Sequence, residues 1–339
     1  MKPDVRAYVI LILLVGAVFG VYLRHAYVTP ISKDITFEVT KGMGGYAVAK
    51  GLSSDIGQRV IYPLLLGVSG YAKHIQVGEY CFPKGLSLKE VFEGLSRGKY
   101  RVAYLLPVVE GMTIQQVQAL LEKAPKLLGD MPTFPAEGMI YPDTYTYFKG
   151  DTRAAVVHVM RQRMIDALLH VWASRDSDCF LKNTDELVVL SSIVEKETSV
   201  PDERGRVAGV YLTRLKKGIP LQADPTVVYG LSSGLGRLDR ALMTGDLKKP
   251  TPYNTYLNKG LPPTAIAIPS LASLKAVAHP HMTGELYFVA TGKGPHVFSK
   301  TLQEHQRHHQ ALRNWRQAQK VQQLDVPKIP GDTKFLPKK

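Results

Sequence analysis

The sequence predicts a mixed α+β protein with a single N-terminal transmembrane helix, a small α+β module and a larger second α+β domain. Three observations indicate this fold class. An apolar segment without charges lies near the N-terminus, short strand-like and helix-like segments alternate after it, and 45% of the 339 residues are hydrophobic while 21% are charged. Since a domain takes roughly 150 residues, two domains with cores of their own are expected. This composition excludes a disordered or fibrous chain.

The first predicted element is an apolar helix. Residues 7–23 contain no charged side chain, and a helix needs roughly 17 to 25 such residues to cross a bilayer. Lys2 and Arg6 precede this segment and Arg24 follows it, so the positive-inside rule favours a cytoplasmic N-terminus only weakly. A signal peptide is the alternative, but no A-x-A cleavage site follows the segment. We therefore expect a cytoplasmic arm over residues 1–6 and an uncleaved anchor over residues 7–27.

The region after the anchor contains a pattern that occurs three times: a Gly and an apolar residue, then Val six and Leu ten positions after the Gly. Its members are Gly42, Met43, Val48 and Leu52, then Gly85, Leu86, Val91 and Leu95, then Gly111, Met112, Val117 and Leu121. The step from Val to Leu is a helical spacing, and Ser87 and Thr113 occupy N-cap positions, so each repeat predicts a strand, a Gly turn and a short helix. The strands are expected at residues 35–39, 78–82 and 102–108, with Tyr80 and Phe82 on one face. The unequal separations of the repeats favour a small α+β module over a solenoid. The alternative is that such strand and helix units recur by chance, as they can in any α+β protein.

The second domain is predicted to be mixed α+β and to begin with helices. A helix is expected over 152–175, and Asn183 with Glu186 has the form of a capping box for a helix over 185–198. Pro201 opens the next helix, which basic residues and Gly218 end. The remaining elements are predicted as a helix at 270–279, strands at 286–290 and 296–299 around a turn at 292–294, and a helix from 302 to about 322.

The charge and the cysteines restrict the classes of function. The chain has 43 Lys and Arg against 29 Asp and Glu, a net charge of +14. Ten of these basic residues and only three acidic ones lie in residues 291–339, and no nucleic-acid motif accompanies them. A membrane surface or an anionic polymer fits this basic region equally well, and no nucleic-acid partner is predicted. Cys81 and Cys179 cannot build a disulfide framework or a four-ligand zinc site.

Two glutamates lie at the end of the helix predicted over 185–198. The helix is apolar almost all round, which is typical of a buried helix, so a carboxyl group there needs a reason. At about 100° per residue, Glu195 and Glu197 lie roughly 200° apart and cannot face one site. A buried Glu has a raised pKa and suits a general acid. The alternative is that either glutamate only pairs with Arg204, Arg206 or Lys196.

Aromatic and amide residues gather in the two segments that follow. Apolar sugar faces stack on Tyr rings, and sugar hydroxyl and acetamido groups bind Asn, Gln and backbone groups. Each residue also has a simpler interpretation, with Asp224 as an N-cap and Tyr253 and Tyr256 as loop packing. The candidate sugar-binding residues are Gln222, Asp224, Tyr229, Tyr253, Asn254, Thr255 and Tyr256.

No metal or cofactor site is predicted. Several histidines lie between residues 279 and 309, but they lack a ligand spacing such as HExxH. We expect His305, His308 and His309 to form a solvated helix face.

The motifs in this chain resemble those of the YceG-like endolytic murein transglycosylases. They occur in the order and spacing of that family and cover nearly the whole chain. The matching segments are EGM at 110–112, EGMIYPDTY at 137–145, IVEKET at 193–198, LQADPTVVYG at 221–230, PYNTY at 252–256, GLPP at 260–263, SLKAVAHP at 273–280 and LYFVATGKGPHVFS at 286–299.

This resemblance implies an inner-membrane, single-pass enzyme whose C-terminal domain lies in the periplasm. It would cleave peptidoglycan glycan strands internally, leave 1,6-anhydro-MurNAc ends and so terminate strand elongation. The first glutamate of IVEKET, Glu195, would be the catalytic acid and base, with Glu197 in a supporting role. The implied domains are a LysM-like module over 33–105, a catalytic domain over 106–325 and a basic tail over 326–339. The implied partners are peptidoglycan glycan strands, the inner membrane and, at the anchor or the tail, cell-wall synthesis enzymes.

Two departures from the family pattern concern loops near the site. Thr264 follows GLPP where Gly is common, and Ser270 ends a segment that more often ends in Pro-Gly. Gly adopts backbone conformations that Thr and Ser resist. The resemblance therefore predicts the chemistry of the site but not the conformation of these two loops. The alternatives to the predicted function are a muramidase that uses water and a non-catalytic wall-binding anchor.

Overall fold

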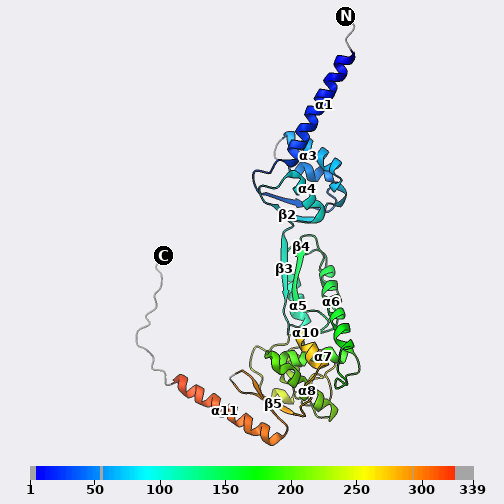
Figure 1. Cartoon of the computed structure of the whole chain (residues 1–339). Coiled ribbons are helices and arrows are strands. Elements are labelled where there is room, and N and C mark those ends of the chain that lie inside the picture. The colour runs from blue at the N-terminus through cyan, green and yellow to red at the C-terminus, as the bar shows by residue number, and fades with distance from the viewer. Residues whose placement is uncertain (1–4, 54–55, 293, 325–339) are drawn as a thin grey trace, which may run out of the picture. The chain divides into compact units, whose positions relative to one another are not determined.

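The computed structural model describes residues 5–53, 56–292 and 294–324 (Figure 1). The chain forms two compact units, and the predicted mixed α+β fold class is confirmed. The first unit comprises Met1–Pro107, Leu120–Pro132 and Thr144–Val156, and the second comprises Val108–Ala119, Thr133–Asp143 and Val157–Lys339. Residues 120–132 and 144–156, which lie within the catalytic domain predicted over 106–325, thus form part of the first unit.

The first unit begins with helix α1 (Val5–Val28). Its segment Tyr8–Val28 is long and apolar enough to cross a membrane, with a mean hydropathy of 2.1 and none of the segment buried in the protein. A row of exposed Leu, Ile and Val side chains is unfavourable in water and favourable in lipid. The helix coincides with the anchor predicted over residues 7–27. Residues 1–4 of the predicted arm lie outside the described residues.

A small α+β module follows α1. Its elements are β1 (Ile35–Val39), α2 (Gly45–Gly51), α3 (Ile56–Ser69), η1 (Tyr71–His74), β2 (Gly78–Phe82) and α4 (Leu88–Arg97). The strands β1 and β2 pair antiparallel. Tyr80 and Phe82 are fully buried and their rings stack with centroids 5.4 Å apart, as the predicted alternation requires. Helix α3 was not predicted, and the identification of this module as LysM-like stays a prediction.

The three repeats each form the predicted strand, Gly turn and helix. Gly42, Gly85 and Gly111 have φ of 88°, 94° and 77°, which only Gly adopts without strain. The Val and Leu residues of every repeat are buried. Ser87 caps α4 in a complete capping box. In the third repeat, β3 (Ala103–Val108) leads to α5 (Ile114–Lys123) and pairs with β4 (Asp143–Phe148), so this repeat belongs to a separate sheet.

A charged cluster joins the strands of the first unit. Lys149 Nζ lies 2.7 Å from Glu38 and 2.9 Å from Glu79. The Tyr104 hydroxyl donates to Glu79 at 2.5 Å. These hydrogen bonds to the carboxylate lower the pKa of Glu79 to about 2.

The second unit is mainly helical. Its helices are most of α6 (Arg153–Ala173), then α7 (Thr184–Glu197), η2 (Pro201–Glu203), α8 (Arg204–Lys216), α9 (Asp224–Leu231), η3 (Asp246–Lys248), α10 (Leu271–Ala278) and α11 (Leu302–Leu324). A hairpin, β5 (Tyr287–Ala290) with β6 (His296–Ser299), precedes α11. Every helix and strand expected after residue 151 is found within one or two residues of its predicted bounds. The predicted turn at 292–294 includes residue 293, which lies outside the described residues.

Helix α7 forms the centre of the second unit. Residues 187–194 are all buried, and α7 packs against α8, α9 and α10. The Asn183 side chain caps α7 by accepting from the Glu186 N–H at 2.9 Å. The Glu186 carboxylate instead accepts from the Lys182 N–H, so only half of the predicted capping box forms. This buried helix fixes the position of the two glutamates at its end.

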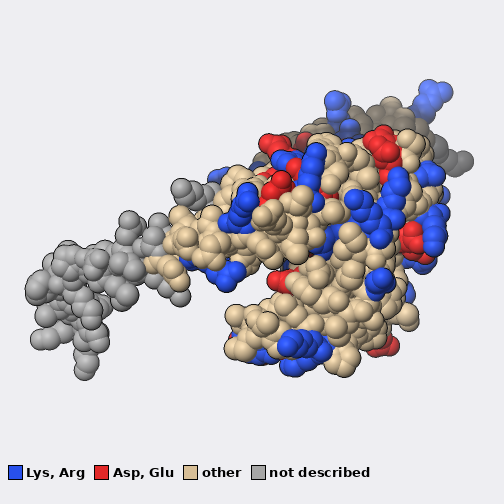
Figure 2. All heavy atoms as spheres, turned by 90° about the horizontal axis from the view of Figure 1, so that it is seen from below, with Lys and Arg blue, Asp and Glu red and all other residues tan. Residues whose placement is uncertain are grey.

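Figure 2 shows Lys and Arg, with fewer Asp and Glu, scattered among the other residues of the face drawn. The predicted basic tail over residues 326–339 lies outside the described residues.

Candidate active site

Glu195 lies between α7 and the beginning of α10. Its Oε2 accepts hydrogen bonds from the Ser270 N–H at 2.9 Å, from the Ser273 hydroxyl at 2.6 Å and from the Ser270 hydroxyl. The Arg204 guanidinium lies 3.8 Å from the other oxygen, Glu195 Oε1, and the Glu195 side chain is 5% exposed. A carboxylate at a helix N-terminus, held by three donors, is favourable for the packing of α7 on α10. Part of the simpler interpretation, pairing of Glu195 with Arg204, therefore applies.

Glu197 faces a different environment, as the helical spacing predicted. It lines a cavity of about 390 Å³ together with Tyr211 and Arg214 of α8. The Tyr211 hydroxyl donates a hydrogen bond to it. Burial raises the pKa of Glu197 to about 7, and the nearby charge of Asp224 adds to this rise, while Tyr211 and Arg214 oppose it. A carboxyl group that titrates near neutrality in a cavity is suited to give and take a proton.

Three of the predicted sugar-binding residues share the cavity with Glu197. These are Gln222, Asp224 and Tyr256. The Tyr256 hydroxyl donates to Asp224 Oδ1 at 2.6 Å, and this contact, with burial as the larger cause, raises the pKa of Tyr256. Asp224 is the first residue of α9 and Ala223 holds the N-cap position, so the interpretation of Asp224 as an N-cap is wrong.

Arg214 fixes the loop that carries Gln222. Its guanidinium donates to the carbonyls of Pro220 and Leu221 at 3.1 and 2.7 Å and to Gln222 Oε1 at 3.3 Å. Gln222 has a φ of 55°, a left-handed conformation that is strained for a residue with a side chain. Strain of this kind persists where the surroundings impose it, and here it directs Gln222 toward the cavity.

The far wall of the cavity comes from β5 and α11. Tyr287 and Phe288 line it with His305 and His309. The rings of Tyr287 and His305 stack with centroids 5.2 Å apart, and His308 contacts the Ser299 hydroxyl at 3.0 Å. Burial lowers the pKa of His305. The prediction that the three histidines form a solvated face is therefore wrong for His305 and His308, which contact the hairpin, whereas His309 is exposed.

Glu203, at the end of η2, and Arg214 of α8 both hold this hairpin. Glu203 accepts from the His296 N–H at 2.6 Å and lies 2.8 Å from its Nδ1. Arg214 Nε donates to the Leu286 carbonyl at 2.7 Å. Arg214 therefore holds both the hairpin and the Gln222 loop around the cavity.

Tyr229 and Tyr253 do not line the Glu197 cavity. Tyr229 donates to Glu137 Oε2 at 3.0 Å, and its ring meets that of Tyr253 edge to face at 4.9 Å. The Tyr253 hydroxyl pairs with Thr264 at 2.9 Å. Burial raises the pKa of Glu137 to about 6, although the Ile114 N–H and Tyr229 donate to it. Thr264, one of the two departures, thus takes part in this network.

Asn254 and Thr255 lie in the interior. Asn254 is fully buried, donates to the carbonyls of Leu247 and Lys249 at 3.0 and 2.8 Å, and accepts from the Tyr256 N–H. The Thr255 hydroxyl accepts from the Ala223 N–H at 3.0 Å. A direct contact with a sugar would require these side chains to leave the interior, and in this structure they hold the loops that carry Gln222 and Tyr256.

The sequence interpretation missed Tyr211, Arg214 and Glu137. Tyr211 and Arg214 are three residues apart on α8, a spacing that places both on one face. The available signal was this shared face, since it places a Tyr and an Arg side by side on the helix that follows the acidic residue Glu197. Glu137 lies in the motif EGMIYPDTY, where its carboxyl group had no assigned partner.

The described residues, 5–53, 56–292 and 294–324, contain no group of three or more His, Cys, Asp or Glu that could hold a metal ion.

The fold and the cavity together define an α+β protein with an apolar N-terminal helix and a buried carboxyl group at a polar, aromatic cavity. The model of the YceG-like family matches residues 37–311, and the chain belongs to this family.

Relatives of the chain have names that state an activity. An endolytic murein transglycosylase of Bacillus subtilis (strain 168) is 29% identical over 332 residues, which cover 86% of this chain and 89% of the relative. An endolytic murein transglycosylase of Streptococcus pneumoniae serotype 2 is 25% identical over 363 residues, covering 91% of this chain and 64% of that relative. The crystal structure of a YceG-like protein from Listeria monocytogenes is 25% identical, with a TM-score of 0.48, and the match covers 81% of this chain and 99% of the other.

Proposed function

We propose that this protein is an endolytic peptidoglycan lytic transglycosylase that cleaves the MurNAc-GlcNAc bond within glycan strands. The family match and the names of two relatives support the activity and the substrate class. The apolar helix α1 supports a membrane anchor. On this proposal the anchor lies in the inner membrane and the C-terminal domain in the periplasm, where internal cleavage of nascent strands would terminate their elongation.

Glu197, rather than Glu195, is the proposed acid and base. The observation that carries this choice is the position of Glu197 at a polar cavity, with a pKa raised to about 7 by burial. Glu195 instead has one oxygen engaged by three donors at the beginning of α10. A general acid needs a free path to the substrate and a pKa close to the working pH, and Glu197 meets both requirements better.

One carboxyl group can perform both proton transfers. The Glu197 acid donates its proton to the glycosidic oxygen as the bond from C1 of MurNAc to that oxygen breaks. The oxygen of the MurNAc C6 hydroxyl then bonds to C1, and the Glu197 carboxylate takes the hydroxyl proton. The products are a 1,6-anhydro-MurNAc end and a new GlcNAc end, no water is consumed, and Glu197 is again protonated.

The remaining candidates have two kinds of role in this proposal. Gln222, Asp224 and Tyr256 line the cavity and contact the glycan. Asn254 and Thr255 position the loops that carry them, and Tyr229 and Tyr253 brace the neighbouring loop with Thr264.

The test compares Glu197→Gln with Glu195→Gln in the full chain. Removing the acid should reduce glycan cleavage by several orders of magnitude, because both proton transfers are lost. Glu122→Gln, at an exposed position of α5, is the control and should cleave like the unmodified protein. Mass analysis of the products identifies anhydro ends, which are lighter by one water than hydrolytic ends.

Each alternative has its own outcome. Loss of cleavage in Glu195→Gln alone would move the acid to Glu195. Products that contain the added water would identify a muramidase. Binding of glycan strands without cleavage by the unmodified protein would identify a wall-binding anchor.

A further inference from the structure

Helix α3 carries an exposed apolar stripe. Ile56, Val60, Leu64 and Val68 are 80%, 70%, 43% and 82% exposed. Residues four apart lie on one helix face, so these side chains form a continuous row over three turns. The opposite face packs into the module, where Leu66 is 1% exposed and the Tyr62 ring meets Phe92 edge to face. A contiguous apolar row of this kind marks a surface that is covered by another phase or molecule.

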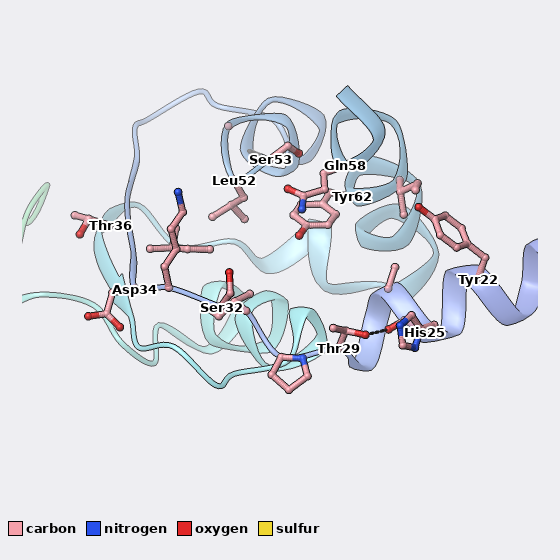
Figure 3. Close-up of a pocket in the computed structure, with 17 residues that line it drawn as sticks. Tyr22, His25, Thr29, Ser32, Asp34, Thr36, Leu52, Ser53, Gln58 and Tyr62 are labelled. Atoms are coloured by element: carbon pink, nitrogen blue, oxygen red, sulfur yellow. Dashed lines mark hydrogen bonds between the residues drawn. The ribbon is translucent and has the colours of Figure 1, made fainter. Parts of the chain in front are cut away.

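The position of α3 beside α1 indicates what covers the row. A cavity of about 570 Å³ is lined by Tyr22, His25 and Ala26 of α1 and by Gln58, Ile61 and Tyr62 of α3. Figure 3 shows Tyr22 and His25 on one side of this cavity and Gln58 and Tyr62 on another. The three α1 residues belong to the apolar segment Tyr8–Val28. If this segment crosses a bilayer, α3 lies level with its last two turns.

We infer that α3 docks on the bilayer surface, with Ile56, Val60, Leu64 and Val68 at the boundary between lipid headgroups and acyl chains. This inference rests on the proposed membrane anchor. Burial of an apolar helix face at this boundary is favourable, and Tyr22 of the neighbouring α1 is of the residue type enriched there. Arg59 is exposed next to Val60, where a guanidinium can bind lipid phosphate.

Docking of α3 gives the module a second attachment to the membrane beside α1. A single helix leaves an attached domain free to tilt, whereas two neighbouring attachments fix its orientation. The module therefore keeps one orientation, with the exposed face of α3 against the lipid surface. A second copy of the chain or another protein on the same row is the competing occupant.

Spin labels in the full chain, reconstituted in vesicles of phosphatidylcholine and phosphatidylglycerol, test this inference. Labels are placed at Val60→Cys and Val68→Cys in a Cys81→Ser background, because Cys179 is buried and Cys81 is exposed. Both valines are largely exposed, so their replacement removes no core contact. A label on the native Cys81 is the control, since β2 lies at the end of the module away from α1 (Figure 1). A label at Leu13→Cys reports insertion of α1.

The measurement is the ratio of accessibility to oxygen, which enters lipid, over accessibility to a water-soluble nickel chelate. We expect a ratio above one at Val60, Val68 and Leu13 and below one at Cys81. A ratio above one at Leu13 but below one at Val60 and Val68 overturns the docking of α3 and leaves the anchor intact. A low ratio at Leu13 overturns the anchor and the docking together. Spin-spin broadening at Val60 with protection from both reagents indicates a second copy and also overturns the docking.

Discussion

At the residue scale, the pKa of Glu197 is set by opposing contacts. Burial and the negative charge of Asp224 raise this pKa to about 7, and the hydrogen bond from Tyr211 lowers it. The proposed acid is active when protonated, so glycan cleavage should decrease about tenfold per pH unit once the pH exceeds this value. This decrease is the alkaline limb of the pH profile. Removing either contact should shift the pH at which the alkaline limb begins.

Two substitutions should move the limb in opposite directions. Asp224→Asn removes a negative charge, which lowers the pKa of Glu197 and shifts the limb to lower pH. Tyr211→Phe removes a donor to the carboxylate, which raises this pKa and shifts the limb to higher pH. The pH dependence of kcat/KM on a defined glycan measures both. Equal profiles in all three proteins would exclude Glu197 as the group that titrates.

The sequence could separate the two glutamates but could not choose between them. Helical geometry places Glu195 and Glu197 on different faces, because that depends only on their spacing. Which face meets a cavity depends on Gln222, Tyr256 and Tyr287, which lie 25 or more residues away along the chain. The choice of Glu195 came from the motif, and the contacts of this structure favour Glu197.

At the scale of elements, α8 packs closely against the loop before β5. A Cβ added at Gly209 would lie 2.1 Å from the His281 carbonyl oxygen. Gly209→Ala should therefore force the backbone apart and lower the free energy of unfolding by about 1 to 3 kcal/mol. Cleavage should also decrease, because α8 carries Tyr211 and Arg214. Chemical denaturation and glycan cleavage measure the two effects.

The matched control for this prediction is Gly67→Ala in α3. A Cβ there meets no atom within 4 Å, and Ala is a better helix former than Gly by about 0.5 to 1 kcal/mol. This variant should be slightly more stable than the unmodified protein. If Gly209→Ala is equally harmless, the close approach of α8 to His281 is not rigid.

Elements with strong local signals could be predicted from the sequence. The Gly, Val and Leu repeat identified three strand and helix pairs, because Gly turns and buried helical spacings are local features. Helix α3 was missed because Pro63 lies inside it and apolar residues occupy both of its faces, which obscures the amphipathic period. The sheet to which the third repeat belongs was not predictable either, because β4 lies 35 residues beyond β3.

At the scale of the whole molecule, the proposed substrate requires the parts that follow α1 to lie outside the cytoplasm. A reporter that is active only outside the cytoplasm, fused after Lys339, should therefore give a signal. The mature protein should also keep its first residues, because no cleavage site follows Leu23. Reporter activity and N-terminal sequencing are the two measurements. A cytoplasmic reporter would separate the enzyme from peptidoglycan and contradict the proposed function.

The described residues form three sheets of only two strands each, so every strand has one edge without a partner strand. On β2 this edge is covered in part by an isolated bridge between Tyr80 and Arg101. Open edges are templates for aggregation between copies. Here the strands are four to six residues long. Glu38 and Glu79 lie opposite each other in the first sheet, with Lys149 bridging them, and short strands with edge charges resist intermolecular pairing. Copies crowded into the plane of a membrane would therefore collide without joining into extended sheets.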